Sequence, residues 1–98
     1  MHIITKRRLR EFWERHADAE HDLRIWQSVV QARRYRTPHD VRAEFTASSF
    51  LGDGVTVFNI TGNKYRLVVA IRYDMGAVFI RHVVTHKEYD RLTKSGSL

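Results

Sequence analysis

Five basic or titratable side chains stand at set points in the largely apolar stretch between residues 55 and 90: Lys64, Arg66, Arg81, His86 and Tyr89. Cations of this kind can stabilise charge on a transferring phosphoryl group, and an imidazole and a phenol can move protons. The set therefore suits metal-free chemistry on a phosphodiester. The same side chains could also grip a nucleic-acid backbone without cutting it, so these residues alone leave both interpretations open.

Other kinds of reactive centre find little support in the sequence. The chain has six histidines and no cysteine, which excludes disulfides, thiol nucleophiles and thiolate zinc sites. His82 and His86 straddle an expected break between a strand and a helix, which spoils the geometry of a metal-binding pair. Residues 62–65 lack the glycine pattern of a phosphate-binding loop and are predicted to form a turn. We expect neither a metal nor a cofactor.

The length and the net charge of the chain limit the classes of protein to which it can belong. The 98 residues are enough for one domain, residues 1–98, and 43% hydrophobic residues can supply its core. The net charge of +6 is typical of a polyanion-binding domain, although a basic surface can also simply keep a protein soluble. No apolar run approaches the ~20 residues of a membrane span, and no signal peptide is visible. The expected location is the cytoplasm, without membrane contact.

The N-terminal half predicts an edge strand at residues 1–4 followed by three helices. The first begins at Thr5, and its inward positions are Leu9, Phe12, Trp13 and His16. Its first turn carries Lys6, Arg7, Arg8 and Arg10, which oppose the helix dipole and are either kept for a partner or simply solvated.

The second helix is predicted to start at Asp18 as N-cap and to end in the basic run 33–36. Its apolar stripe consists of Leu23, Trp26, Val29 and Val30. Thr37-Pro38 predicts a third, brief helix through Phe45, with Thr37 as its N-cap. We expect the two larger helices to pair as a hairpin on one side of a sheet.

The C-terminal half predicts strands at residues 47–51, 55–60, 65–73 and 77–85. The turns between them fall at residues 52–54, 61–63 and 74–76, where glycine supplies positive φ angles. The predicted fold is therefore α+β, a small antiparallel meander with N-terminal helices packed on one face.

The register of the last hairpin decides which side chains share a face. With Met75-Gly76 as a two-residue loop, the core face carries Leu67, Val69 and Ile71 opposite Val84, His82 and Ile80. Arg66 and Arg81 then lie together on the other face, and His82 points to the core. A β-bulge would alter this prediction.

A short C-terminal helix is predicted to begin at His86, because residues 85–88 fit the Thr-x-x-Glu capping box. His86 and Tyr89 are then three positions apart on one side of the helix, beyond the end of the strand that carries Arg81.

Two segments, residues 57–68 and 80–90, closely resemble the HigB-type toxins of bacterial toxin-antitoxin modules, within the RelE-like superfamily. The resemblance rests on Phe-Asn-x-x-Gly-Asn at residues 58–63 combined with Thr-His-Lys-Glu-Tyr-Asp at residues 85–90. It extends to the opening residues 1–5 and so covers nearly the whole chain. The fold it implies agrees with the one predicted above.

The resemblance implies an mRNA interferase that cuts translated messages in the ribosomal A site and is neutralised by a helix-turn-helix antitoxin of the HigA kind. In RelE-like enzymes a 2′-hydroxyl attacks the adjacent phosphate without a metal. Arg66 and Arg81 would then stabilise the phosphorane, while Lys64, His86 and Tyr89 would move protons. The expected RNA contacts are Asn63, Lys64, Arg66, Arg72, Arg81 and Lys87. Asn63 and Asp90 would also shape the turn and the helix.

A second hypothesis, from a different class, is a non-catalytic RNA- or ribosome-binding module on the same scaffold. Cleavage of a translated message separates the two, because binding alone would stall translation and leave the RNA intact.

Overall fold

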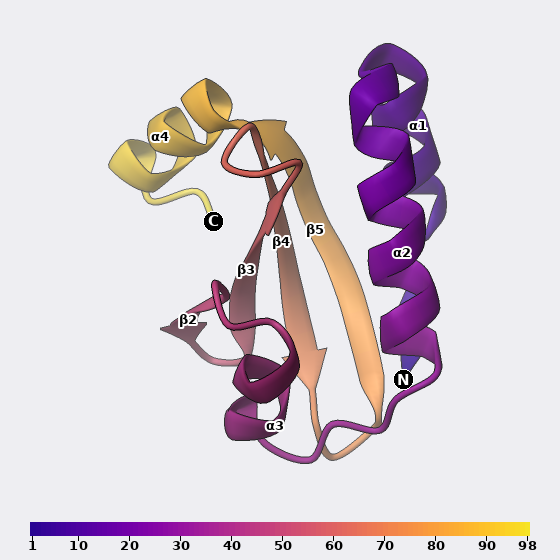
Figure 1. Cartoon of the computed structure of the whole chain (residues 1–98). Coiled ribbons are helices and arrows are strands. Elements are labelled where there is room, and N and C mark those ends of the chain that lie inside the picture. Colours follow the sequence, from indigo (N-terminus) through magenta and orange to yellow (C-terminus); the bar gives the residue numbers. More distant parts are fainter.

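The computed structural model describes residues 1–98 as five strands in one sheet, with four α-helices around it (Figure 1). The elements are β1 (His2–Ile4), α1 (Arg7–Arg15), a short 3₁₀ helix η1 (Ala17–Ala19), α2 (Glu20–Gln31), α3 (Pro38–Glu44), β2 (Ser49–Gly52), β3 (Val55–Ile60), β4 (Tyr65–Arg72), β5 (Ala77–Thr85) and α4 (His86–Ser95). The α+β prediction is confirmed. None of the helices is long and apolar enough to cross a membrane.

The core lies between one face of the sheet and the helices α1, α2 and α3. Helix α1 contributes Leu9 and Phe12 to it, and α2 contributes Leu23, Trp26 and Val30. Their spacing of three to four residues puts each set on a single stripe of its helix. The expected pairing of the two longer helices on one side of the sheet is confirmed, and Figure 1 shows α4 on the opposite side of the strands from α1 and α2.

The second helix differs from its prediction at both ends. Asp18 is not its N-cap: the chain first makes the turn η1, and Ala19 takes the cap position without a side-chain hydrogen bond. The Asp18 carboxylate instead binds residues of the sheet, because the α1–α2 corner packs against the β3–β4 turn. The helix also stops at Gln31, and residues 33–36 form an irregular segment in which Arg33 pairs with Glu44 at 3.0 Å.

The start of α3 follows its sequence signal closely. Thr37 is the N-cap, its hydroxyl accepts from the Asp40 backbone N–H at 3.3 Å, and Pro38 takes the first helical position. Phe45 ends the helix and packs on the core, as predicted.

The sheet has the order β1-β5-β4-β3-β2, and β2 to β5 form the predicted antiparallel meander. The predicted edge strand at the N-terminus is β1, which pairs with β5 in parallel and is the one exception to the antiparallel pairing of the sheet. The pairing covers only residues 77–79 of β5, and helix α1 runs beside the remainder of that strand.

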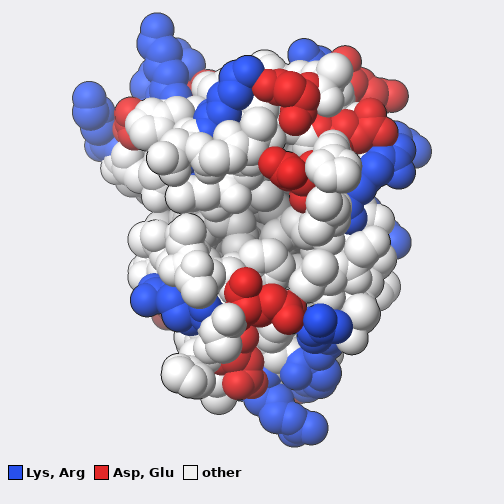
Figure 2. All heavy atoms as spheres, in the orientation of Figure 1, with Lys and Arg blue, Asp and Glu red and all other residues white.

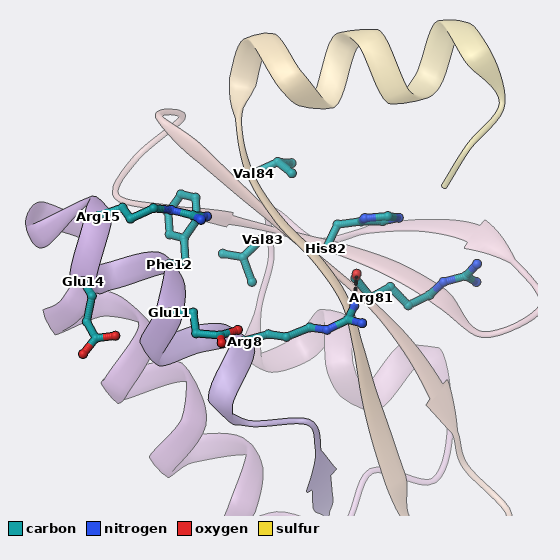
Figure 3. A pocket seen from close by; sticks show the side chains of 9 residues that line it. All are labelled: Arg8, Glu11, Phe12, Glu14, Arg15, Arg81, His82, Val83 and Val84. Carbon is teal, nitrogen blue, oxygen red and sulfur yellow. Dashed lines mark hydrogen bonds between the residues drawn. The ribbon is translucent and has the colours of Figure 1, made fainter.

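The predicted register of the β4–β5 hairpin is wrong. Arg72 pairs with Ala77 across a four-residue loop, and the pairing shifts between Val68 and Val69. Arg81 is the extra residue of a β-bulge, which turns Arg81 and His82 toward the same side while Val83 faces Phe12 of α1 (Figure 3). His82 therefore pairs with Val68 on the face away from the core, not on the core side. Arg81 does share the non-core side with Arg66, as predicted, because it follows the core residue Ile80. The bulge changes the side of His82 instead.

Helix α4 begins at His86 as predicted, and its capping box is complete. The Thr85 hydroxyl accepts from the Glu88 backbone N–H at 3.2 Å, and a Glu88 carboxylate oxygen accepts from the Thr85 backbone N–H at 2.9 Å. The helix ends at Gly96, whose φ of +70° suits glycine.

Candidate functional site

Arg66 and His86 meet where β4 begins and α4 starts. Arg66 Nη2 lies 2.9 Å from His86 Nδ1, and Arg66 Nη1 donates to the Asn63 carbonyl at 2.8 Å. The guanidinium carbon is 5.8 Å from the centre of the Tyr89 ring. Three of the five predicted catalytic residues are therefore in one cluster, which we call the Arg66 cluster: Arg66, His86 and Tyr89.

The contacts of His86 indicate which tautomer its neutral ring adopts. A guanidinium can only donate, so His86 Nδ1 accepts from Arg66 and the ring proton resides on Nε2. His86 Nε2 lies 3.4 Å from an Asp90 carboxylate oxygen, one helical turn further on. The imidazole is held in one tautomer, with its basic nitrogen directed at the guanidinium.

Backbone contacts fix the cluster to the sheet. The His86 backbone N–H donates to the Lys64 carbonyl at 3.1 Å, which ties the first turn of α4 to the start of β4. The Thr85 backbone N–H holds the pKa of Glu88 below its usual value, so this carboxylate stays charged and the cap stays closed. The positions of His86 and Tyr89 therefore depend on the capping box.

Lys64 is close in sequence but its ammonium group is engaged elsewhere. It forms an ion pair with Asp18, whose other oxygen accepts from the Tyr65 hydroxyl at 2.6 Å. The hydrogen bond to Asp18 raises the pKa of Lys64, and the same bond lowers the pKa of Asp18. Lys64 therefore stays positively charged at neutral pH, which suits it to bind an anion rather than to accept a proton.

Arg81 lies apart from the Arg66 cluster. Arg66 pairs with Val84, three residues along β5, so the two arginines are separated by roughly 10 Å of strand. Figure 3 shows Arg81 and His82 extending together from β5, and Arg8 donating to the Arg81 carbonyl at 2.7 Å. Burial lowers the pKa of His82, and the backbone of Ser97 opposes that shift. His82 thus lines the same side as Arg81 as a neutral group.

The remaining predicted RNA contacts divide into near and far positions. Asn63 lies in the turn before β4, where its side-chain oxygen accepts from Asn59 at 3.2 Å. Lys87 is exposed in the first turn of α4. Arg72 is at the opposite end of β4, six residues or roughly 20 Å from Arg66, and faces Asp74 at 3.5 Å. The structure thus brings Asn63 and Lys87 to the cluster end of the sheet and leaves Arg72 away from it.

Sequence reasoning missed the roles of three residues. The sequence predicts Asp18 as a helix cap, His82 as a core residue and Asp90 only as a helix-shaping residue. The spacing of His86 and Asp90, one turn apart on the predicted helix, was a usable signal. Nothing local links Asp18 to Lys64, which are 46 positions apart.

The surroundings of the cluster are basic and solvent-exposed. Figure 2 shows lysine and arginine side chains projecting over α4, and a mixture of acidic and basic side chains at the upper end of the α1–α2 hairpin. No group of three or more histidine, aspartate or glutamate side chains is arranged to hold a metal ion. What the cluster offers is a guanidinium, an oriented imidazole and a phenol, all reachable from solvent.

These features define a class: a small α+β domain whose basic sheet end presents groups for binding a phosphate and moving protons. Residues 19–92 match the family described as HigB_toxin, RelE-like toxic component of a toxin-antitoxin system. The chain belongs to this family, and the expected RelE-like fold agrees with the observed one.

Curated relatives extend the similarity over almost the whole chain. The mRNA interferase toxin HigB of Escherichia coli (strain K12) is 30% identical over 95 residues, which cover 95% of this chain and 91% of the relative. The mRNA interferase HigB of Shigella flexneri matches equally, and that of Escherichia coli O6:H1 is 27% identical over 96 residues, covering 96% of this chain and 93% of the relative. As a member of a toxin family of toxin-antitoxin systems, the protein has an antitoxin as its partner.

Proposed function

We propose that this protein is an mRNA interferase, a toxin that inhibits translation by cutting messages on the ribosome without a metal. The relatives named mRNA interferase support the activity. The single observation that supports the mechanism is the contact of 2.9 Å between Arg66 and His86, which couples a phosphate-binding cation to a proton acceptor.

The proposed reaction is an attack of a 2′-hydroxyl on the adjacent phosphorus. The new bond joins the 2′ oxygen to phosphorus and the bond to the 5′ oxygen breaks, leaving a 2′,3′-cyclic phosphate and a 5′-hydroxyl end. One proton leaves the 2′-hydroxyl and one must reach the 5′ oxygen, so a base and an acid are required.

The cluster supplies groups for each role. Arg66 turns from His86 to the non-bridging oxygens, because a charged phosphate is a stronger acceptor than an imidazole. This frees His86 Nδ1 to take the 2′ proton, and the Tyr89 hydroxyl donates to the leaving oxygen. The positive charges of Lys64 and Arg81 attract the phosphates on either side of the one that is cleaved. His86 is then the general base and Tyr89 the general acid.

The openness of the Arg66 cluster is the reason to place the reaction in the ribosomal A site. The His86 side chain is 54% exposed, so the cluster itself does not enclose a substrate. An open site of this kind cannot order a flexible RNA strand for in-line attack, and holding reactants in place can contribute a large part of a rate enhancement. A translated message held in the A site is already ordered. The protein would act in the cytoplasm and be silenced there by a HigA-like helix-turn-helix antitoxin.

The test is cleavage of a message on purified translating ribosomes, with the new 5′ ends mapped. We expect cuts within the A-site codon, and a rate ~10²–10⁴-fold lower for His86→Ala as the loss of a general base. Arg36→Ala, an exposed arginine away from the cluster, is the matched control and should cut normally. A chelator of transition metals, at a magnesium level that keeps ribosomes intact, should leave the rate unchanged.

Two outcomes would contradict this function. Stalled ribosomes with an intact message would show the non-catalytic binding module instead. Normal cutting by His86→Ala would remove the imidazole from the mechanism.

A further inference from the structure

Helix α4 carries His86 and Tyr89, yet none of its 10 residues is fully buried. The capping box and the backbone contact to the Lys64 carbonyl hold its first turn. A helix that is held only at its start can pivot about that point, and its far end frays. The orientation of α4, and with it the position of His86 and Tyr89, therefore also depends on what holds its C-terminal end.

Residues 96–98, which we call the α4 tail, turn back from the end of the helix toward the sheet (Figure 1). Gly96 reverses the chain with a φ of +70°. Gly96 and Leu98 then border a hollow of about 390 Å³, and Arg81 of β5 lines the same hollow together with residues of the β2–β3 hairpin. The tail therefore lies against the side of the sheet that carries Arg66.

His82 is the residue of β5 that meets the α4 tail. The β-bulge turns its imidazole away from the core, and Figure 3 shows the ring directed at the pale yellow end of the chain. A hydrogen bond with the backbone of Ser97 raises the pKa of His82, although burial lowers it more. A backbone group raises the pKa of an imidazole only as an acceptor, because an acceptor stabilises the protonated ring. The His82 ring therefore donates an N–H to the Ser97 carbonyl.

The part of the sheet beneath α4 has a small apolar floor. Val57 pairs with Val68, and Val68 pairs with His82 on the next strand. Both valines are buried, although they lie outside the core cluster between the sheet and the N-terminal helices. Helix α4 contacts β4 and β5, and its side chain Leu92 and the tail side chain Leu98 are half-buried. The contact of His82 with the tail is therefore made where α4 and the tail close over the sheet.

We propose that His82 is a positioning residue for the cleavage: its hydrogen bond to the α4 tail anchors the C-terminal end of α4 and thereby keeps His86 and Tyr89 beside Arg66. This inference rests on the proposed function, because His82 acts on the reaction only through those two side chains. The capping box at the start of α4 and His82 at its end together fix the direction of the helix. A displacement of about 1 Å in a catalytic group can lower a rate ~10²-fold, so this direction matters for catalysis.

The test changes each side of this contact and pairs each change with a conservative variant. His82→Leu removes the donor, whereas His82→Gln keeps an N–H donor on a side chain of similar reach. Gly96→Val redirects the tail, because a β-branched residue is strained at positive φ, whereas Gly96→Asn tolerates that conformation. A Cβ at Gly96 meets no heavy atom within 4 Å, so the two variants differ in backbone strain and not in a clash of this atom. His39→Leu, at an exposed position of α3, is the matched control.

Amide hydrogen exchange and cleavage on message-programmed ribosomes are the two measurements. We expect His82→Leu and Gly96→Val to speed exchange in the second half of α4 and to leave the amides of β4 unchanged. Their kcat should fall roughly 10–10²-fold with little change in KM, because the proton-transfer groups move and the phosphate-binding cations do not. His82→Gln, Gly96→Asn and His39→Leu should behave as the unchanged protein. The double variant His82→Leu/Gly96→Val should be no slower than the slower single variant, because both changes break one contact.

Several results would overturn the positioning role of His82. A normal kcat of folded His82→Leu would do so, and a raised KM with kcat kept would make His82 a direct RNA contact instead. Multiplied losses in the double variant would show that the imidazole and the tail act separately. If His82→Leu does not fold, the exposed tail still decides, because equal rates of Gly96→Val and Gly96→Asn would contradict the anchor.

The exchange measurement separates this inference from the proposed function, because it needs no substrate. If the amides of α4 exchange as expected while the unchanged protein cuts no message, His82 stands as the anchor of α4 and the proposed function fails. If the unchanged protein cuts and neither His82→Leu nor Gly96→Val alters exchange or kcat, the proposed function stands and the anchor fails.

Discussion

Arg66 joins three parts of the chain through one side chain. Its guanidinium donates to the Asn63 and Tyr65 carbonyls at 2.8 and 3.2 Å and contacts the His86 ring. A planar group with five donors can keep some of these bonds while its fork binds two phosphate oxygens, whereas an ammonium group has only three donors and no such fork. The same residue therefore holds the β3–β4 turn against α4 and remains available to the substrate.

Asp18 provides a test at the level of single residues. In Asp18→Asn the ion pair with Lys64 is lost, and we expect a lower free energy of unfolding at pH 7. The pKa of Asp18 is lowered in the folded protein, so its contribution is present above the unfolded value near ~3.9 and is lost as the pH falls through the folded value. The pKa of Lys64 is raised in the folded protein, so the contribution of Lys64 to the free energy of unfolding is lost only as the pH rises through that higher value.

Urea denaturation of both proteins at pH 7 and at about pH 3 measures this effect. The difference in the free energy of unfolding between the unchanged protein and Asp18→Asn should be smaller at the acidic pH. Asp53→Asn is the control, because Asp53 forms no ion pair and asparagine suits its positive φ of 53°. A gap of equal size at both pH values would rule out the charge of Asp18 as its cause.

At the scale of elements, the junction of β5 and α4 decides where the imidazole and the phenol lie. Thr85→Ala removes the hydroxyl that accepts from the Glu88 backbone N–H, and losing such a cap costs about 1 kcal/mol. We expect thermal unfolding at a lower temperature and slower cleavage, since His86 and Tyr89 occupy the first turn that would fray. Thr85→Ser keeps the hydroxyl and should restore both properties. Equal stability of Thr85→Ala and Thr85→Ser would show that the cap does not hold α4.

The bulge in β5 is the second element that shapes the basic side of the sheet. By adding one residue opposite Val68, it turns Arg81 and His82 outward together while Val83 still packs against the core. A regular strand would alternate these residues between the two faces. The bulge therefore places the imidazole of His82 beside Arg81, on the same side as Arg66, without removing an apolar residue from the core.

At the scale of the whole molecule, the net charge of +6 predicts how RNA binding depends on salt. The affinity for a single-stranded RNA should fall as salt rises, with a slope of about 0.7 in log K for each phosphate neutralised. Arg66→Ala should reduce that slope by roughly 0.7, since one contact is lost. Binding titrations at several salt concentrations measure both values. A flat response would exclude an electrostatic contribution to RNA binding.

Features that depend on a few neighbouring residues can be predicted from the sequence. Thr85 and Glu88 define the start of α4, Thr37 and Pro38 the start of α3, and the glycines at 52 and 54 the β2–β3 hairpin, because each acts within four residues of chain. These signals, together with the resemblance, were enough to predict the fold class and to associate Arg66, His86 and Tyr89.

Features that join distant parts of the chain depend on how the elements pack together in three dimensions. The ion pair of Asp18 with Lys64 links residues 46 positions apart, and the parallel pairing of β1 with β5 links the first residues to positions 77–79. The bulge at Arg81 follows from how β5 packs against β4 and α1 at once. A local pattern cannot predict these long-range contacts. The same strand sequence is compatible with two registers that differ by one residue, and the register decides which face of the sheet each side chain occupies.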